Sequence, residues 1–159
     1  MEDLRDARET WSLANCTIAH ALDILGNRSA MLILREAFLG TRRFEDFVDR
    51  VGAGEPAMAA RLKALVQAEL LERVPYREPG QRTRHEYHLT QKGRELQPVI
   101  TALRVWGDTW TTDEAGPPVV AVHRGCGAPV RAALRCEHDH EVQDGEIAII
   151  AGPGLIRIA

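Results

Sequence analysis

The stretch that decides the fold is residues 53–90, which read AGEPAMAARLKALVQAELLERVPYREPGQRTRHEYHLT. Its first part places apolar residues on one helical face at the 3.6-residue period: Met58, Leu62, Leu65 and Val66. The segments LLERVPY and RHEYHLT then alternate roughly between apolar and polar residues, around a Pro-Gly turn. A helix followed by a basic β-hairpin predicts a winged helix-turn-helix, a mainly α fold whose helix enters the major groove of DNA.

Composition limits the chain to one core, with room for a small appended module. It has 159 residues, of which 45% are hydrophobic. No run of eighteen apolar residues occurs and the N-terminus is charged, so we expect a cytoplasmic protein with no membrane partner. Three cysteines at dissimilar spacings do not form a secreted disulfide framework, and they favour a reactive thiol or a metal site.

The overall charge is unfavourable for a DNA-binding protein, but its distribution is not. The net charge is −3 and the pI is about 6.1, whereas affinity for DNA comes mostly from neutralising phosphates. Between residues 73 and 85, however, four arginines stand against Glu78 alone: Arg73, Arg77, Arg82 and Arg84. This local excess of +3 lies where a wing should carry it. A solvated arginine-rich hairpin without a partner is the alternative.

Three helices are predicted before this stretch. The first follows Asn15, a plausible N-cap, and ends at Gly26 and Asn27, which tolerate a left-handed cap. The second, residues 29–39, contains the run MLIL and is predicted to be the central buried helix. The third has a narrow apolar stripe of Phe44, Phe47, Val48 and Val51. Gly52 and Gly54 then supply the turn of a helix-turn-helix.

Residues 90–110 predict one long amphipathic helix, with possible bends at Pro98 and Gly107. Its apolar face consists of Leu96, Val99, Ile100, Leu103, Trp106 and Trp110. Because this face is too large for so small a domain to cover, we expect it to form a homodimer interface. Packing on its own domain alone is the other interpretation.

The composition shifts at Gly116-Pro117-Pro118, which we take as a boundary. After it, VVAVHR, PVRAALRC and EIAIIA read as short strands of a small β-rich C-terminal appendage. The expected organisation is an N-terminal arm (residues 1–15), a DNA-binding and dimerisation domain (residues 16–115) and the β-rich module (residues 116–159).

Several separated blocks together resemble the HxlR-type winged helix-turn-helix transcriptional regulators, relatives of the MarR group. The blocks are CTIAHALDILGNRSAMLILREAFLGTRRFEDF, RLKALVQAELLERVPY, EYHLTQKGREL and WGDTW, in this order between residues 16 and 110. The resemblance implies a dimeric DNA-binding regulator with residues 55–67 as recognition helix, 71–89 as wing and 91–110 pairing with a second subunit. The HRGCG segment is also similar to tails found in such proteins, which commonly carry further cysteines.

The recognition helix departs from the family, whose first turn is usually rich in Ser, Pro and Arg. Here that turn carries Glu55, Pro56 and Ala57. Alanine can contact a thymine methyl group but cannot form bidentate hydrogen bonds to bases, so shape and backbone contacts should carry more of the specificity. The expected DNA-binding residues are Arg42, Arg43, Ala57, Ala60, Arg61, Lys63, Arg77, Arg82 and Arg84.

A second departure lies in the second helix. Relatives usually have a tryptophan after the basic residue, where this chain has Ser29 after Arg28. The lost volume leaves space that either repacks or forms an effector pocket between the first two helices and the long one.

Cys16 occupies the position similar to the thiol sensor of some HxlR-type regulators. A helix N-terminus favours a thiolate, and His20 one turn later would favour it further. An inert core cysteine is the alternative. We expect oxidation, if it occurs, to join Cys16 to Cys16 of the partner subunit.

The tail contains possible zinc ligands: His123, Cys126, Cys136, His138 and His140. Zinc sites use four N or S ligands, and His123-x-x-Cys126 has the spacing of a knuckle. The second half, Cys136-x-His138-x-His140, is irregular, so a metal-free β-module is the alternative and no cofactor is required.

These observations predict a homodimeric, sequence-specific regulator of transcription, a repressor that binds double-stranded operator DNA. We expect it to respond to a small-molecule effector or to thiol oxidation through a population shift. The alternative is a ligand- or metal-binding module with weakened DNA recognition. A thiol or metal enzyme is not expected, because no third orienting group, phosphate loop or paired acids occur at suitable spacing.

Overall fold

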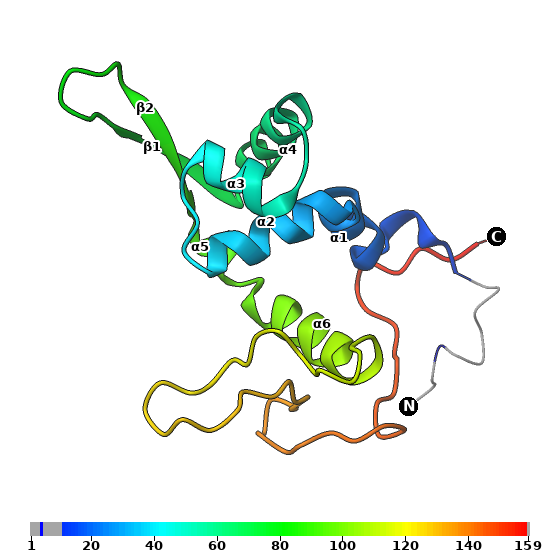
Figure 1. The fold of residues 1–159 in the computed structure, drawn as a ribbon. Helices are drawn as coiled ribbons and strands as arrows, with labels where there is room; N and C mark the ends of the chain where they lie inside the picture. Colours follow the sequence, from blue (N-terminus) through cyan, green and yellow to red (C-terminus); the bar gives the residue numbers. More distant parts are fainter. Residues whose placement is uncertain (1–3, 5–10, 159) are drawn as a thin grey trace.

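The computed structural model describes residue 4 and residues 11–158 and is mainly helical, with one two-stranded sheet (Figure 1). A 3₁₀ turn (Leu13–Asn15) precedes helices α1 (Thr17–Leu25), α2 (Arg28–Phe38), α3 (Phe44–Val51) and α4 (Glu55–Gln67). Strands β1 (Leu71–Tyr76) and β2 (Arg84–Leu89) follow, and then helices α5 (Gln91–Arg94) and α6 (Gln97–Trp110). The winged helix-turn-helix prediction is confirmed. Most of the predicted N-terminal arm lies outside the described residues.

The core is built around α2, as predicted. Ala30, Ile33, Leu34 and Ala37 recur at three- and four-residue steps and are fully or almost fully buried. α3, α4 and the base of the hairpin pack against this face. The other buried members of the core are Phe47, Met58, Leu62, Leu65, Leu70, Leu71 and Leu89.

The junction between α1 and α2 differs from the prediction in two details. Cys16, not Asn15, is the N-cap residue of α1. Gly26 has a φ of −67°, so it is not a left-handed cap. Glycine suits this position for another reason, because a Cβ there would lie 2.5 Å from the Leu22 carbonyl oxygen. Asn27 caps α2, since its side chain accepts a hydrogen bond from the Ser29 N–H at 2.9 Å.

The hairpin is antiparallel, with Leu71 opposite Leu89 at its base and Tyr76 opposite Arg84 toward its tip. Its base is tied to the helices by the backbone. The Tyr87 N–H donates to the Arg42 carbonyl oxygen at 2.8 Å. The ring of Tyr87 also packs edge-on against Phe47, with centroids 6.2 Å apart. These contacts fix where the wing leaves the helical body.

The predicted long helix at residues 90–110 is broken, and this part of the prediction is wrong. α5 ends at Arg94, and α6 begins at Gln97 with Pro98 in its first turn. Proline suits a first turn because its missing N–H would have no partner there. Thr90 caps α5 by accepting from the Gly93 N–H at 3.0 Å. α6 continues through Gly107, so no break occurs there. The break lies directly before Pro98, which has no N–H to donate to the Arg94 carbonyl oxygen, so one of the two predicted bends coincides with it.

The strands predicted after residue 116 are also wrong. Within residues 116–158 the structure has only the isolated bridges Val122–Pro129 and Arg135–Glu141, besides a bridge from Arg157 to Trp11. Each of the first two bridges closes a short hairpin, and an isolated hairpin without further strands is only marginally stable. The alternating pattern of VVAVHR, PVRAALRC and EIAIIA therefore lacked the neighbouring strands that a sheet needs.

α2 lies between the predicted DNA-binding elements and α6 (Figure 1). α4 and the hairpin lie on one side of α2, and α6 lies on the other. The chain after α6 passes beneath this helix and returns toward α1. There the Asn15 side chain donates to the Gly154 carbonyl oxygen at 3.0 Å, and the Ser12 N–H donates to the Ile156 carbonyl oxygen.

Gly93 allows α5 to approach the connection between α4 and β1 closely, because a Cβ would overlap the Leu70 carbonyl group. We expect Gly93→Ala to lower the unfolding free energy by about 1–3 kcal/mol through overpacking. Gly107→Ala in α6 is the matched control. Its Cβ would meet nothing closer than 3.5 Å, so it should be neutral or raise stability by about 0.5–1 kcal/mol. Urea denaturation measures both, and equal effects would contradict this explanation.

Candidate nucleic-acid interface

The helix-turn-helix consists of α3, the turn at Gly52 and α4. Gly52 ends α3 in the left-handed conformation with a φ of +70°, which glycine adopts without strain. α4 buries Met58, Leu62 and Leu65. Its outward face is formed by Ala57, Ala60, Lys63 and the half-buried Arg61. This leaves one face of α4 free to enter a groove.

Two cations of α4 are available for contacts with a ligand. Among the described residues, neither Arg61 nor Lys63 has an ion-pair partner. Lys63 also lines a cleft of about 300 Å³ between α4 and the hairpin, together with Arg73 and Tyr87. The alanines predicted beside them, Ala57 and Ala60, are exposed.

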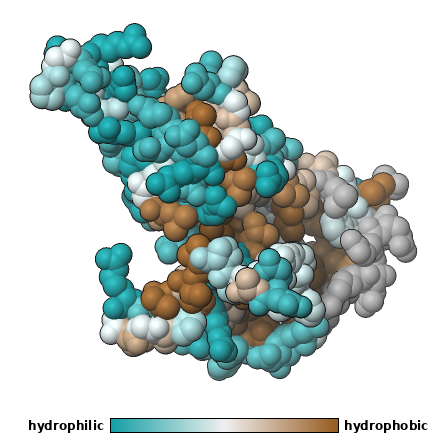
Figure 2. Space-filling view, in the orientation of Figure 1, coloured by the Kyte–Doolittle hydropathy of each residue, from teal (hydrophilic) through white to brown (hydrophobic). Residues whose placement is uncertain are grey.

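The wing carries arginines of two kinds. Arg84 forms an ion pair with Glu45 at 2.9 Å, and the Arg77 Nε donates to the Gln81 carbonyl oxygen at 3.0 Å. Arg73 contacts the His85 ring nitrogen at 2.9 Å. In the part of the chain that the structure describes, Arg82 has no ion-pair partner. Hydrophilic residues cover the hairpin in Figure 2.

Arg42 and Arg43 are engaged within the protein. The Arg42 guanidinium donates to the carbonyl oxygens of Ala37 at 2.7 Å and Thr41 at 2.9 Å, which closes the end of α2. Arg43 pairs with Glu78 at 3.0 Å and lies over the Tyr76 ring. Tyr76 is the main cause that raises the pKa of Arg43, followed by Glu78 and Glu86, so this side chain stays charged.

Of the seven cations predicted to bind DNA, the structure leaves three unpaired on the surface, Arg61, Lys63 and Arg82. Arg42 and Arg77 bond to backbone carbonyl oxygens, and Arg43 and Arg84 pair with acids. Two of these acids, Glu45 and Glu86, were missed from the sequence. Glu86 directly follows residues 73–85, over which the charges of the wing were counted, so a count over a slightly longer segment would have included it. Glu45 is 39 residues from Arg84, and no local signal connects the two.

A second surface lies between α1 and α6, where apolar residues gather around the helices (Figure 2). Leu96 and Ile100 of the predicted dimer face pack against the protein's own core. The others are exposed: Val99, Leu103, Trp106 and Trp110, the last at 73%. Ile18 and Leu22 of α1 are also exposed, and they line one groove together with Val99 and Leu103. We call these six residues the α1–α6 surface.

This surface contains a groove of about 760 Å³ between α1, α2 and α6. It lies where the effector pocket was expected. Its lining includes Leu22, Leu25, Arg28, Met31 and Leu103, but not Ser29. Ser29 is half-buried, and its N–H is held by the Asn27 side chain. The structure thus has a groove at this place, Ser29 does not line it, and its use as an effector pocket stays a prediction.

Cys16 lies at the N-terminus of α1 and is half-buried. Thr17, the next residue, lines the groove. His20 is exposed one turn further on, and its N–H donates to the Cys16 carbonyl oxygen at 3.0 Å. The structure therefore places the thiol at the end of the α1–α6 surface.

The tail brings together only part of the predicted metal set. His123 Nδ1 lies 3.2 Å from Cys126 Sγ. The rings of His138 and His140 are tilted, with centroids 6.3 Å apart. Within the described residues, no group of three His, Cys, Asp or Glu side chains is arranged to hold a metal ion.

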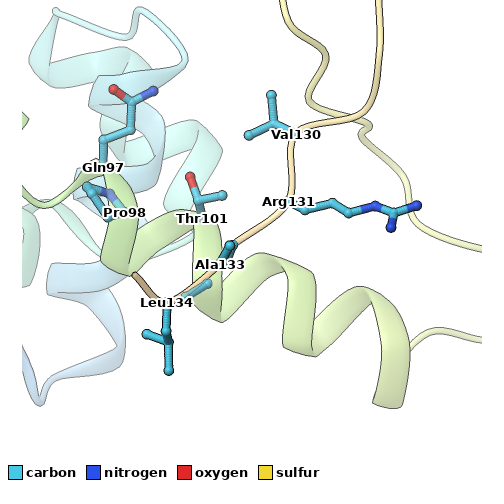
Figure 3. A pocket seen from close by; sticks show the side chains of 9 residues that line it. Gln97, Pro98, Thr101, Val130, Arg131, Ala133 and Leu134 are labelled. Atoms are coloured by element: carbon cyan, nitrogen blue, oxygen red, sulfur yellow. The ribbon is translucent and has the colours of Figure 1, made fainter. Parts of the chain in front are cut away.

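A further cleft of about 600 Å³ separates the tail from α6 (Figure 3). Gln97, Pro98 and Thr101 line it from the helix, and residues 130–134 line it from the tail. Arg131 extends away from this cleft in Figure 3. The tail is tied to α6 nearby, because Arg104 donates to the Val130 carbonyl oxygen at 3.4 Å.

None of the helices in the described part of the chain is long and apolar enough to cross a membrane. The arrangement of α3, α4 and the hairpin defines a winged helix-turn-helix protein, and comparisons with known proteins identify the family. The HxlR-like helix-turn-helix family model matches residues 24–115. The chain belongs to the HxlR family and is a transcriptional regulator with a DNA-binding helix-turn-helix domain.

Individual relatives agree with this assignment. An uncharacterised HTH-type transcriptional regulator from Mycobacterium tuberculosis is 38% identical over 140 residues, which cover 87% of each chain. The regulator YodB from Bacillus subtilis is 33% identical over 89 residues, 55% of this chain and 78% of YodB. The crystal structure of the transcription factor candidate PA1607 has 34% sequence identity to this chain and a TM-score of 0.77, and the match covers 87% of this chain and 96% of that one.

Proposed function

We propose that the chain is a homodimeric repressor that binds operator DNA through α4 and the hairpin. We further propose that occupation of the groove by a small-molecule effector, or oxidation of Cys16, controls this binding. The observation that carries the proposal is the opposite placement of two surfaces. The free face of α4 and the wing lie on one side of α2, and α6, which carries most of the exposed apolar α1–α6 surface, lies on the other.

The DNA-binding half of the proposal follows from the chemistry of the exposed groups. Arg61, Lys63 and Arg82 are the cations left for phosphates or bases. Ala57 and Ala60 can contact thymine methyl groups but offer no hydrogen bonds to base edges. A protein with few base contacts derives more of its specificity from DNA shape, and its affinity falls steeply as salt is added.

We expect Arg61→Ala, Lys63→Ala and Arg82→Ala each to weaken binding to the promoter DNA of the protein's own gene. Each lost phosphate contact should reduce the slope of log affinity against log salt by about one. Arg131→Ala removes the same charge from the tail and is the matched control, which should keep the wild-type slope. Fluorescence anisotropy between 50 and 200 mM salt measures both quantities.

Two results would change this assignment. If the intact dimer fails to bind at low salt, where phosphate contacts are strongest, the chain is the alternative, a ligand-binding module with weakened DNA recognition. The alanine-rich face of α4 and the paired wing arginines favour that alternative. If deletion of the gene lowers transcription from a bound promoter, the protein is an activator and not a repressor.

The dimer half of the proposal rests on exposed apolar area. Trp106 and Trp110 are 58% and 73% exposed, and Leu103 and Ile18 are 54% and 69% exposed. Soluble monomers rarely expose so continuous an apolar patch, which is typical of an interface. Two-fold pairing through this surface leaves both copies of α4 on the outside, as successive half-sites about 34–36 Å apart require.

We expect Leu103→Glu to convert the protein into a monomer, because each interface would then bury unpaired carboxylates. Leu39→Glu is the matched control, because Leu39 is 62% exposed but lies outside the α1–α6 surface. Light scattering after size-exclusion chromatography reports the mass of each variant. A monomeric wild-type chain, or an L103E variant that stays dimeric, contradicts the proposed interface.

The redox part of the proposal rests on Cys16 at the end of this surface. Two copies of α1 that pair near their N-termini bring two Cys16 thiols close together. Hydrogen peroxide would oxidise the two thiols to one disulfide. The peroxide is reduced to two water molecules, which take up the two thiol hydrogens. A related regulator supports this idea, because YodB has been solved in a form described as reduced. That structure has 30% sequence identity to this chain and a TM-score of 0.52. The match covers 64% of this chain and 97% of YodB.

Under mild peroxide we expect a disulfide-linked dimer that runs at twice the monomer mass without reductant and loses affinity for DNA. Cys16→Ser should abolish the linked species, and Cys126→Ser should retain it. Peptide mass spectrometry after differential alkylation gives the same answer independently. Free Cys16 thiol in peroxide-treated protein would exclude the redox mechanism and leave the groove as the effector site.

A further inference from the structure

The tail has no core of its own. Among residues 116–158 none belongs to the buried core, and large aliphatic side chains are exposed along the segment: Val119, Val120, Val122, Leu134, Ile149, Ile150, Ile156 and Ile158. Segments of only about 40 residues seldom hold a fold by apolar burial alone and usually need a disulfide, a metal ion or a partner. All three cysteines are free.

The two short hairpins of the tail have related turns. In the first, the Cys126 N–H donates to the His123 carbonyl oxygen at 3.3 Å. In the second, the Asp139 N–H donates to the Cys136 carbonyl oxygen at 2.9 Å. Each turn therefore presents two side chains with metal-binding atoms at positions i and i+3, the spacing of a zinc knuckle. Asp139 was not among the residues predicted from the sequence.

The first turn already has the geometry of half a metal site. Zn–N and Zn–S bonds of about 2.0–2.1 Å and 2.3 Å in a tetrahedron place the two ligand atoms about 3.5 Å apart. His123 Nδ1 and Cys126 Sγ are 3.2 Å apart. Gly125 makes room for the imidazole, because a Cβ there would lie 3.0 Å from His123 Cε1. Gly127, with a φ of +71°, completes the turn.

We propose that the tail is a zinc-binding module whose ligands are His123, Cys126, Cys136 and Asp139. Zinc joins the two turns and releases the two thiol protons to solvent, which couples metal binding to folding of the tail. Only residues 130–134 separate the bridged ends of the hairpins, so the second turn is held at high effective concentration beside the first. The proposal does not rest on the DNA-binding function.

One contact competes with the metal. Arg135 donates to the Asp139 carboxylate at 2.9 Å, but the side chains of this pair are 52% and 82% exposed. Exposed ion pairs contribute little, so zinc can replace the guanidinium. Once the turns meet, the aliphatic residues on their flanks, such as Val122 and Leu134, can pack together.

Metal titration of the full, untagged chain tests the proposal, after removal of bound metal with a chelator under reductant. We expect one zinc per chain, and a cobalt(II) complex whose thiolate charge-transfer absorption arises from two sulfur ligands. Cys126→Ser, Cys136→Ser and Asp139→Asn should each weaken zinc binding by at least about 10–100-fold. Cys16→Ser and His140→Asn are the matched controls and should bind as the wild type does.

Proteolysis gives a second readout. Zinc should protect the bonds after Arg131 and Arg135 from trypsin, while the unfolding temperature of the helical domain stays the same in the C136S variant. Less than stoichiometric zinc, or equal losses in C16S and C136S, would overturn the proposal. Loss of binding in His140→Asn but not in Asp139→Asn would overturn the choice of ligands. These results are independent of gel-shift measurements, so either proposal can fail alone.

Discussion

Burial of one face of α2 is the constraint on which the rest of the structure depends. Ile33 and Leu34 have no exposed surface, and α1, α3, α4, α6 and β2 all contact this helix. The same helix carries a buried acid, because Glu36 accepts hydrogen bonds from Arg35 at 2.7 Å and Thr41 at 3.0 Å. A buried carboxylate needs such partners. The contact with Thr41 directs the chain from the end of α2 toward α3 and the wing.

Local patterns in the sequence predicted the elements that face this core. α4 and both strands lie within a residue of their expected bounds, because an apolar stripe at helical spacing and a Pro-Gly turn are local signals. The break between α5 and α6 lies directly before Pro98, a local signal for a bend, whereas the close approach of Gly93 to Leu70 is a tertiary contact that no local pattern indicates. The strands predicted in the tail are absent from the described residues because a tertiary partner is lacking. An alternating pattern indicates a strand, but the strand forms only when a neighbouring strand pairs with it.

In the candidate DNA-binding surface, too, some features follow from local sequence signals and others depend on tertiary contacts. Its location follows from the fold, whereas the availability of each arginine depends on partners that are distant in sequence. Arg42 closes the end of α2 and Arg84 binds Glu45, so neither is a free cation. A count of charges along the sequence therefore overestimates the positive potential that DNA would meet. The net charge of −3 is consistent with a protein that concentrates a few unpaired cations on one side.

The hydrogen bond from the Tyr87 N–H to the Arg42 carbonyl oxygen has a mechanical consequence. It links the base of the wing directly to the segment that leaves α2, and the Phe47–Tyr87 ring contact joins the same strand to α3. These two contacts hold the wing in a fixed orientation relative to α2 and α3. In the dimer proposed above, a change at α1 or α6 would therefore rotate the helices and the wing together about the α1–α6 surface. A rotation of a few degrees at that pivot becomes a displacement of several ångströms at the far tip of the hairpin.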